Sequence, residues 1–304
     1  MKQLTVISGK GGTGKTVVTA AFAHLASHGS DPPVAVFVDA DVDASNLELL
    51  IGRRRTEEHE FTGPSIAVVR PERCIGCGIC LDVCRFGAVW LDDNGSGYGI
   101  DAHACEGCAA CFHQCPTAAI ELVPQVAGHW YRSESYDAAP FFHGRLRPAQ
   151  ENSGKLVTTI KERARAAAEE GGYPLMIVDG PPGIACPAIA ASAGADLGLV
   201  VAEPTVAGLQ DLERAVEMLA HFRVRGVACV NKSDLHPAGT RAIEDECRSL
   251  GVDVLTPIPF DEAVPRTMAE GRPVTDMAPD ADASRALARL WGDVGRLLED
   301  IEQR

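Results

Sequence analysis

The segment GKGGTGKT, at residues 9–16, constrains the fold of this chain more than any other stretch. It follows the apolar run LTVIS at residues 4–8 and precedes a helical stretch that begins at Thr16. A strand, a glycine-rich turn and a helix in this order predict a phosphate-binding loop. The glycines let backbone amides approach phosphate oxygens, and the N-terminus of the following helix adds positive potential.

The residues of this loop are expected to have different roles. Lys15 is expected to reach the β- and γ-phosphates of a nucleotide, which makes it a candidate catalytic residue, and Thr16 is expected to bind Mg²⁺. The residues expected to surround the phosphates with their backbone are Gly9, Gly11, Gly12, Thr13 and Gly14. The pattern therefore predicts a nucleotide site that contains magnesium.

Short apolar runs alternate with helical stretches, such as 16–28 and 208–222, outside residues 65–124. The runs are rich in Val, Ile and Leu without polar alternation, which is typical of strands buried on both faces. The expected strands are LTVIS (4–8), VAVFV (34–38), LMIV (175–178), LGLVVA (197–202), GVACV (226–230) and VDVLTPI (252–258). This order predicts an α/β fold with a mostly parallel, doubly wound sheet and helices on both faces.

Residues 65–124 contain an internal repeat, in which RPERCIGCGICLDVCRFGAVWL aligns with DAHACEGCAACFHQCPTAAIEL. Every cysteine of the first copy has a counterpart in the second. The duplication predicts a small inserted domain with approximate two-fold symmetry, little core of its own and support from bound metal. The expected domains are 1–64 and 125–304 for the nucleotide-binding part and 65–124 for the insert. A linker over 124–150, with aromatic side chains that cover the sheet or the insert, is expected after it.

Each copy of the repeat carries its cysteines in the spacing C-x2-C-x2-C-x3-C. This short spacing is typical of iron–sulfur ligation, because three ligands from one tight loop can face three irons of a cube. Zinc is the alternative, although zinc more often takes C-x2-C pairs separated by longer gaps. The cysteines are Cys74, Cys77, Cys80 and Cys84 in the first copy and Cys105, Cys108, Cys111 and Cys115 in the second.

Composition limits the partners. The formal net charge of −14 and the pI of about 5.1 disfavour non-specific binding to nucleic acid or anionic lipid. The chain shows no long apolar run and no signal peptide, so we expect no membrane span and a cytoplasmic location. Eight of the 11 cysteines lie in the two runs, which in a cytosolic context favours thiolate ligands over disulfides.

The loop contains a second lysine, Lys10, that an ordinary phosphate-binding loop does not need. GKGGxGKT is the motif of the MinD/ParA/Mrp family of deviant Walker ATPases, and the chain resembles that family from residue 1 to about 275. The resemblance implies that the protein forms a homodimer with ATP. It also implies that Lys10 crosses the dimer interface as a catalytic residue for the partner's nucleotide.

Two acidic segments extend this resemblance. VDADVDASN (38–46) resembles the family's switch I, which implies that Asp39 and Asp41 lie next to the γ-phosphate and magnesium, with Asp41 orienting the attacking water. IVDGPPG (177–183) resembles a Walker B strand followed by switch II. It implies that Asp179 lies in the site and that Gly183 offers its amide to the γ-phosphate.

The sequence indicates the residues that bind the base less directly. NKSD (231–234) is similar to the guanine-reading NKxD motif of G proteins, which leaves GTP as an alternative. In the MinD-like family, however, an Asn at the end of this strand reads adenine, and residues 257–274 resemble the family's base-binding loop. The resemblance favours ATP, with Asn231 and Pro259 at the base.

The two cysteine runs resemble bacterial two-cluster ferredoxins, in which the fourth cysteine of each run ligates the other cluster. Pro116 follows the second run as that motif expects, whereas Arg85 departs from it after the first. The resemblance implies two [4Fe–4S] clusters, one on Cys74, Cys77, Cys80 and Cys115 and the other on Cys105, Cys108, Cys111 and Cys84.

An insert directly after switch I predicts an ATP-gated electron donor to a protein partner. The alternative is an iron–sulfur or metal-cofactor carrier of the Mrp type, which delivers to an acceptor protein. A positioning role like that of MinD or ParA is disfavoured, because it needs an anchor and the charges of the amphipathic C-terminal stretch cancel. We expect this stretch to pack on the core through Leu287, Leu290, Trp291, Val294, Leu297, Leu298 and Ile301.

Cys186 follows Asp179 at the spacing of a cluster-ligating cysteine in the nitrogenase iron protein, which this segment resembles. The resemblance implies a bridging-metal or redox role near a dimer axis. The alternative is a packing residue at the start of an alanine-rich helix. Cys229 and Cys247 fit strand and helix interiors, so neither supplies a second ligand for such a bridge.

Overall fold

The computed structural model describes residues 1–28, 35–92, 97–147 and 153–302. Contacts between Cα atoms divide the chain into two compact units. The sheet unit contains residues 1–59, 130–145 and 153–304, and the insert unit contains residues 60–129 and 146–152. Two long strands, β3 (Arg54–Val69) and β6 (Ile120–Glu134), have residues in both units. The insert predicted over 65–124 falls inside the insert unit, and its limits as a domain stay a prediction.

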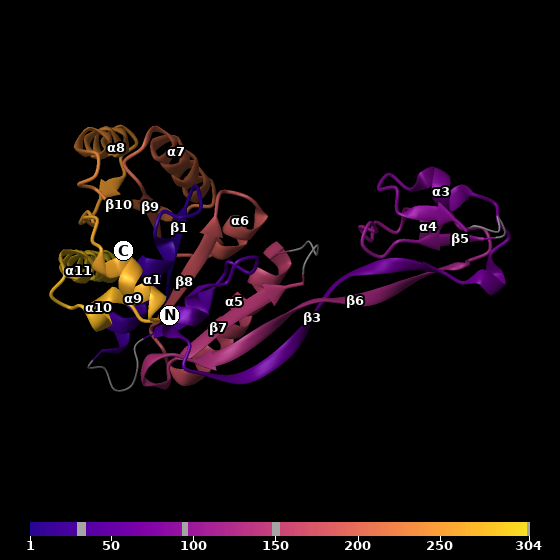
Figure 1. Cartoon of the computed structure of the whole chain (residues 1–304), viewed down its shortest axis with the longest axis horizontal. Helices are drawn as coiled ribbons and strands as arrows, with labels where there is room; N and C mark the ends of the chain where they lie inside the picture. Colours follow the sequence, from indigo (N-terminus) through magenta and orange to yellow (C-terminus); the bar gives the residue numbers. More distant parts are fainter. Residues whose placement is uncertain (29–34, 93–96, 148–152, 303–304) are drawn as a thin grey trace. The chain divides into compact units, whose positions relative to one another are not determined.

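In the described residues, nine strands form one sheet with the order β11-β10-β9-β1-β8-β2-β7-β6-β3 (Figure 1). Strand β1 pairs in parallel with β8 and β9, and β2 pairs in parallel with β8 and β7. This confirms the predicted mostly parallel sheet. The remaining strand bounds are β1 (Lys2–Ser8), β2 (Ala35–Asp39), β7 (Pro140–Leu146), β8 (Leu175–Pro182), β9 (Leu197–Ala202), β10 (Arg225–Val230) and β11 (Asp253–Val254).

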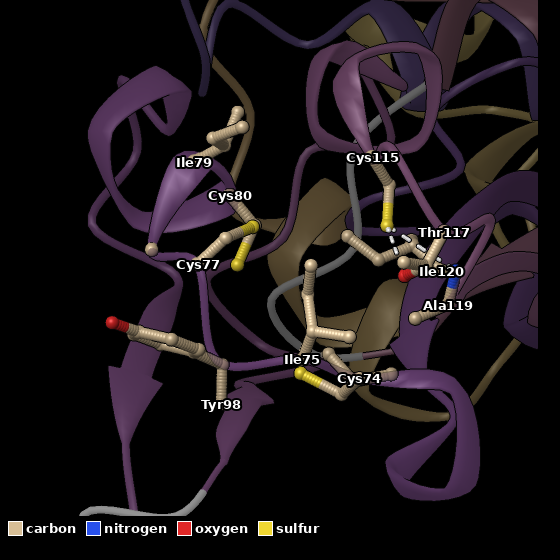
Figure 2. A pocket seen from close by; sticks show the side chains of 12 residues that line it. Cys74, Ile75, Cys77, Ile79, Cys80, Tyr98, Cys115, Thr117, Ala119 and Ile120 are labelled. Carbon is tan, nitrogen blue, oxygen red and sulfur yellow. Dashed lines mark hydrogen bonds between the residues drawn. The ribbon is translucent and has the colours of Figure 1, made fainter.

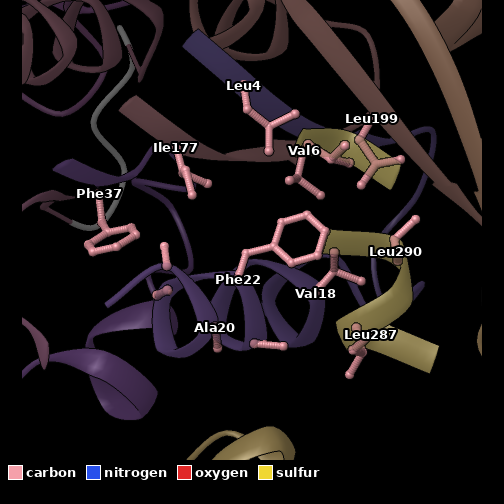
Figure 3. Packing of buried hydrophobic residues seen from close by; sticks show 14 of the residues in the cluster. Leu4, Val6, Val18, Ala20, Phe22, Phe37, Ile177, Leu199, Leu287 and Leu290 are labelled. Atoms are coloured by element: carbon pink, nitrogen blue, oxygen red, sulfur yellow. The ribbon is translucent and has the colours of Figure 1, made fainter. Parts of the chain in front are cut away.

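Helices cover both faces of the sheet, because neighbouring strand residues point to opposite sides. Leu4 and Val6 of β1 pack with α1 (Lys15–Ser27), whereas Ile7 packs with the helices of the other face. Figure 3 shows Phe22 of α1 below the strand residues Leu4 and Val6. The first face carries α1, α2 (Leu47–Ile51), α10 (Val274–Met277) and α11 (Asp282–Glu302), and the second carries α5 (Ser153–Gly171), α6 (Cys186–Ser192), α7 (Val206–His221) and α8 (Pro237–Ser249). A further short helix, α9 (Ala263–Ala269), precedes α10.

The C-terminal helix α11 packs on α1, as predicted. The side chains of Leu287, Leu290, Val294 and Leu298 are buried in the core, and Trp291, Leu297 and Ile301 pack against it. The ring of Trp291 lies 5.0 Å from that of Phe22. In the part of the chain that the structure describes, no helix is both long enough and apolar enough to cross a membrane.

Two expectations about the chain were wrong. The predicted linker over 124–150 instead forms most of β6 and β7, joined through the 3-10 turn η2 (Tyr136–Ala138), and Phe141 of β7 pairs with Phe37 of β2. The strand predicted over 252–258 is only Asp253–Val254 plus one bridge between Asn231 and Ile258. Prolines at 257 and 259 lack the amide that a longer ladder needs.

The insert unit contains two copies of one small motif. Helix α3 (Ile79–Val83) of the first copy corresponds to α4 (Ala110–Gln114) of the second, and a short 3-10 turn η1 (Pro71–Arg73) precedes the first cysteine run. The copies exchange equivalent hydrogen bonds, since Arg70 N donates to Ala119 O and Asp101 N donates to Ala88 O. The strands β4 (Val89–Leu91) and β5 (Tyr98–Ile100) form an antiparallel pair. This reciprocity agrees with the predicted two-fold symmetry.

Candidate functional site

The phosphate-binding loop connects β1 to α1, where the sequence predicts it. Gly12 and Gly14 have φ angles of 79° and 98°, which glycine adopts without strain. Two glycines also permit close approaches, because an added Cβ would lie 2.3 Å from Cβ of Asp211 at Gly9 and 2.3 Å from Nδ2 of Asn231 at Gly14. The loop is therefore held closely between α7 and the end of β10.

Two buried aspartates lie beside the start of α1. Asp39, at the end of β2, and Asp179, in β8, pair in register across the sheet. Asp179 accepts hydrogen bonds from Oγ1 of Thr16 at 2.8 Å and of Thr19 at 2.9 Å. Asp39 accepts one from Oγ of Ser45 at 2.8 Å. The hydroxyl of Thr16 and the two carboxylates are the hard oxygen ligands that Mg²⁺ prefers.

The electrostatics of this pair fit a bound cation. Burial and the nearby charge of Asp179 raise the pKa of Asp39. Burial also raises the pKa of Asp179, although Lys15 acts in the opposite direction. Two buried carboxylates this close ionise together only at a high free-energy cost. A divalent cation would remove that cost, so the residues present suit magnesium.

A cleft of about 650 Å³ opens beside the loop, a size typical of small-molecule sites. Lys15, Thr16 and Asp41 line its polar end. Burial raises the pKa of Asp41, whereas the charge of Lys15 lowers it. The hydroxyl of Thr13 is buried without a hydrogen-bond partner among the described residues, so the loop has an unused polar group. The apolar end is lined by Leu49, Leu50, Ile258, Pro259, Phe260 and Val264.

Asn231 holds the loop, a role that sequence reasoning missed. Its Nδ2 donates to the carbonyl of Thr13 at 2.8 Å, and its Oδ1 accepts from the amide of Lys232 at 2.9 Å. Asn231 also lines the cleft, so its contact with a base stays a prediction. Asp234 does not line the cleft, and its Oδ1 instead accepts from the amide of Phe260 at 2.6 Å.

Gly183 has another partner in this state. It adopts a φ of 85°, and its amide donates to the carbonyl of Ser8 at 2.9 Å. The predicted contact between this amide and a γ-phosphate therefore requires the hydrogen bond to Ser8 to break first. It stays a prediction.

The second lysine of the loop is paired within its own chain. Nζ of Lys10 lies 3.2 Å from Glu203, and Nζ of Lys232 lies 2.6 Å from the same carboxylate. Burial would raise the pKa of Glu203, but the two lysines outweigh it and the pKa is lowered. Sequence reasoning missed Glu203, because β9 and β10, which precede the acid and Lys232, give no local signal of this contact.

Four cysteines from both copies of the repeat surround one cavity of the insert unit (Figure 2). Cys74, Cys77 and Cys80 come from the first copy and Cys115 from the second. The amide of Ala119 donates to Sγ of Cys115 at 3.2 Å. One cysteine of the second run thus shares a cavity with three of the first, and their role as ligands stays a prediction.

A second cavity has the complementary set. Its lining includes Cys105, Cys108 and Cys111 from the second copy and Cys84 from the first. The turns of both runs use positive φ angles at equivalent positions, 70° at Gly76 and 65° at Gly107. Both cavities also have apolar walls, which include Ile75, Ile79, Ile120, Phe86, Val89 and Ile100.

The donor set suits iron–sulfur clusters, which take cysteine thiolates as ligands. Burial raises the pKa of Cys80 and of its counterpart Cys111. At Cys84 and Cys115 backbone amides outweigh burial and lower the pKa, which favours thiolates. Among the described residues, no group of three or more His, Cys, Asp or Glu side chains could hold one metal ion.

The three remaining cysteines differ in exposure. Cys186 is exposed at the start of α6, and its bridging role stays a prediction. Cys229 and Cys247 are fully buried, as expected. Burial raises the pKa of the Cys229 thiol to about 12 and that of Cys247 to about 11, so both stay protonated and act as packing residues.

Comparison with known proteins agrees with the geometry of the sheet unit. The sequence profile of the CobQ/CobB/MinD/ParA nucleotide binding domain matches residues 4–274. The chain belongs to this family. An uncharacterized protein of Methanocaldococcus jannaschii is 33% identical over 267 residues, which cover 88% of this chain and 87% of that protein.

One further relative matches a short part of the chain, and one solved structure matches its fold. An uncharacterized ferredoxin of Methanocaldococcus jannaschii is 47% identical over 55 residues, which cover 17% of this chain and 71% of the ferredoxin. The septum site-determining protein MinD of Pyrococcus horikoshii, solved with Mg-ADP, has a TM-score of 0.56 and 16% identity. That alignment covers 99% of this chain and 98% of that one, and it shows the fold.

Proposed function

We propose that the protein is an ATP-binding and ATP-hydrolysing dimeric switch that carries two [4Fe–4S] clusters and gates electron transfer to a protein partner. The main observation is the division of eight cysteines between two cavities, in a chain whose other unit contains a phosphate-binding loop. The family match supports the nucleotide part, and the ferredoxin relative supports the cluster part.

ATP with magnesium is the proposed nucleotide. Lys15 and the backbone of the loop bind the phosphates, and Thr16, Asp39 and Asp179 hold the cation. The solved MinD with Mg-ADP supports this choice. The position of Asp234 favours adenine over guanine. Its carboxylate accepts a hydrogen bond from the backbone of Phe260 and does not line the cleft, where it would have to lie to read guanine.

Hydrolysis depends on Asp41, which lines the cleft, and on Lys10 of the phosphate-binding loop. Asp41 lines the phosphate end and orients the attacking water, which positions the nucleophile without covalent chemistry. Lys10 leaves Glu203 and completes the site of a second copy. Each nucleotide site lacks the ammonium of the second copy's Lys10 until two chains associate, so hydrolysis occurs only in the homodimer.

The chain path links the nucleotide to the insert unit. Switch I, residues 38–46, leads through α2 into β3, which continues into the insert unit. Within the sheet unit, Glu48 of α2 pairs with Arg55 of β3 at 2.9 Å, and the amide of Arg53 donates to the backbone carbonyl of Glu134 of β6 at 2.8 Å. A rearrangement of switch I therefore acts on both strands that enter the insert unit. A segment with two arrangements, such as switch I, is the kind of element that couples two sites.

The cysteines have the role of cluster ligands. The first set, Cys74, Cys77, Cys80 and Cys115, would hold one cluster, and Cys105, Cys108, Cys111 and Cys84 would hold the other. Such clusters supply one-electron chemistry when bound. The protein lowers the pKa of Cys84 and Cys115 through backbone amides and surrounds each set with apolar side chains.

The test uses anaerobically purified protein. We expect about eight irons per chain and a reduced-state EPR signal of two interacting clusters. Cys111→Ala should lose about half of the iron, whereas Cys247→Ala, a buried cysteine outside the cavities, should keep it. The rate of cluster oxidation by a viologen dye should change with ATP in the wild type and not in Lys15→Ala. Stoichiometric zinc without labile sulfide would refute the clusters, and equal dye rates in every state would refute the gating.

A cluster-carrier role is the second candidate, and one observation favours it. Cys77 and its counterpart Cys108 are exposed, which gives an acceptor protein access to one ligand of each predicted cluster. The same preparation distinguishes the two roles when it is mixed with an apo-ferredoxin. Iron that moves to the apo-ferredoxin on ATP addition supports the carrier. Iron that stays and cycles reversibly under dithionite supports electron transfer.

A further inference from the structure

A polar cavity of about 420 Å³ lies in the sheet unit at the C-terminal end of α1. Its walls come from the last turn of α1, from Arg53 before β3, from Ser135 and Tyr136 at η2, and from the segment around α10. The phosphate-binding loop is at the other end of α1, and 13 helical residues span about 20 Å. The cavity is therefore separate from the nucleotide cleft.

The cavity has a surplus of positive charge. Arg272 bonds both oxygens of Asp276, at 2.9 and 2.7 Å, so these two charges balance. Arg53 lies with its guanidinium 4.2 Å from the ring centre of Tyr136 and makes no ion pair with any described residue. A guanidinium stacked on a ring keeps its N–H edge available for an oxyanion. The C-terminal dipole of α1 opposes an anion by about half a charge, which is less than the charge of Arg53.

Two buried hydroxyls in the wall have no hydrogen-bond partner within the described part of the chain. Ser27 and Ser135 line the cavity, and their side chains are 1% and 2% exposed. Oγ of each makes no hydrogen bond among the described residues. A buried hydroxyl without a partner costs free energy, and rotation about its Cα–Cβ bond can direct it into the cavity. Two unused donors beside an unpaired guanidinium point to an acceptor-rich ligand.

We infer that this cavity is a second anion site, which binds a phosphate dianion independently of the nucleotide. Arg53 supplies the charge-assisted contact, and the hydroxyls of Ser27 and Ser135 donate to the remaining oxygens. The dianion is inorganic phosphate or the phosphate group of a small monoester. The imidazole of His28, which also lines the cavity, can donate a further hydrogen bond. The ring of His24 is already engaged, because its Nδ1 lies 3.1 Å from Oγ1 of Thr275 and its Nε2 lies 4.0 Å from Asp276.

The test must first fill the phosphate-binding loop, because that loop also binds phosphate. Protein saturated with Mg-ADP is titrated calorimetrically with inorganic phosphate at constant ionic strength, set with potassium chloride. We expect one phosphate per chain, and binding weakened at least tenfold in Arg53→Gln. Arg248→Gln, which removes an exposed arginine from α8, should bind phosphate as the wild type does. Glycerol 3-phosphate in a parallel titration distinguishes the sources, because the tighter ligand identifies the natural class.

Two more variants keep the inference falsifiable if Arg53→Gln unfolds. Arg53→Lys keeps the charge but loses the planar fork, so it should bind phosphate with intermediate affinity. Ser27→Ala with Ser135→Ala removes only the unpaired hydroxyls, and it should weaken phosphate binding severalfold without lowering the melting temperature. No phosphate heat in the wild type, or wild-type affinity in folded Arg53→Gln, would overturn the site.

Discussion

Lys10 forms an ion pair within its own chain that must break before the proposed dimer can form. Its ammonium shares Glu203 with Lys232 in one chain, and the proposed role requires it to reach the nucleotide of a second chain. The Lys10 side chain is 34% exposed, so water screens the pair and its contribution is about 0.2–1 kcal/mol. Release of Lys10 is therefore a small but real cost of dimer formation.

Removal of the acid should make the ATP-bound dimer easier to form. Glu203→Gln keeps the shape and loses the charge. Each dimer releases two such pairs, about 0.4–2 kcal/mol together, so we expect the dimer dissociation constant to fall about two- to thirtyfold. Sedimentation equilibrium with a non-hydrolysable ATP analogue measures it. Glu217→Gln, which neutralises an exposed acid of α7, serves as the control. A weaker dimer in Glu203→Gln would mean that Glu203 positions Lys10 within the dimer instead.

At the scale of an element, β7 carries a buried histidine beside switch I. His143 is 1% exposed and pairs in register with Asp39 of β2. Its Nε2 lies 2.9 Å from Oγ of Ser133, and its ring stacks on that of Phe141 at 4.8 Å. Burial lowers the pKa of His143 to about 4, because the charge of Glu48 does not compensate for the lost solvation and for the nearby charges of Arg55 and Arg145. The strand therefore holds this imidazole neutral.

This pKa predicts acid sensitivity of the sheet unit. In the unfolded chain a histidine has a pKa of about 6.5, so between pH 6.5 and 4 the unfolded state binds more protons. Stability should consequently fall as the pH decreases through that window, by about 2 kcal/mol at pH 5 from this group. Urea midpoints at pH 7 and pH 5 measure the fall. His143→Gln should flatten it, and the exposed His221→Gln should not. An unchanged fall in His143→Gln would contradict the assignment.

Sequence reasoning succeeded where the signal is local or repeated. The phosphate-binding loop needs only one strand, one turn and one helix, and the resemblance of the two runs to two-cluster ferredoxins indicates which cysteines share a cavity. It failed for β3, whose run TEEHE is polar because the strand lies at the edge of the sheet. It also missed β6 and β7, since their partners are distant in sequence. The contacts of Glu203 and Asn231 join separate elements and leave no pattern in the chain.

At the scale of the whole molecule, the nucleotide end of the sheet unit has apolar side chains without cover. Val206 at the start of α7 is 80% exposed, and Leu49, which lines the cleft, is 67% exposed. The loop residue Lys10 lies at the same end, because Gly9 contacts Asp211 of α7. A second copy that receives Lys10 would also cover these side chains. Formation of the proposed dimer therefore both completes the catalytic site and covers exposed apolar side chains.

The last prediction separates nucleotide binding from association. Wild-type protein should sediment as a monomer without nucleotide and as a dimer with ATP, and it should return to the monomer as ATP is consumed. Asp41→Asn should remain a dimer because it cannot orient water, and Lys15→Ala should stay a monomer because it binds no ATP. Val206→Asp should bind ATP normally yet dimerise at least tenfold more weakly, since a charge would be buried in the contact. Leu250→Asp, a 41% exposed site at the end of α8, is the control. A monomer at every concentration, together with wild-type turnover in Lys10→Ala, would show that each chain hydrolyses ATP alone.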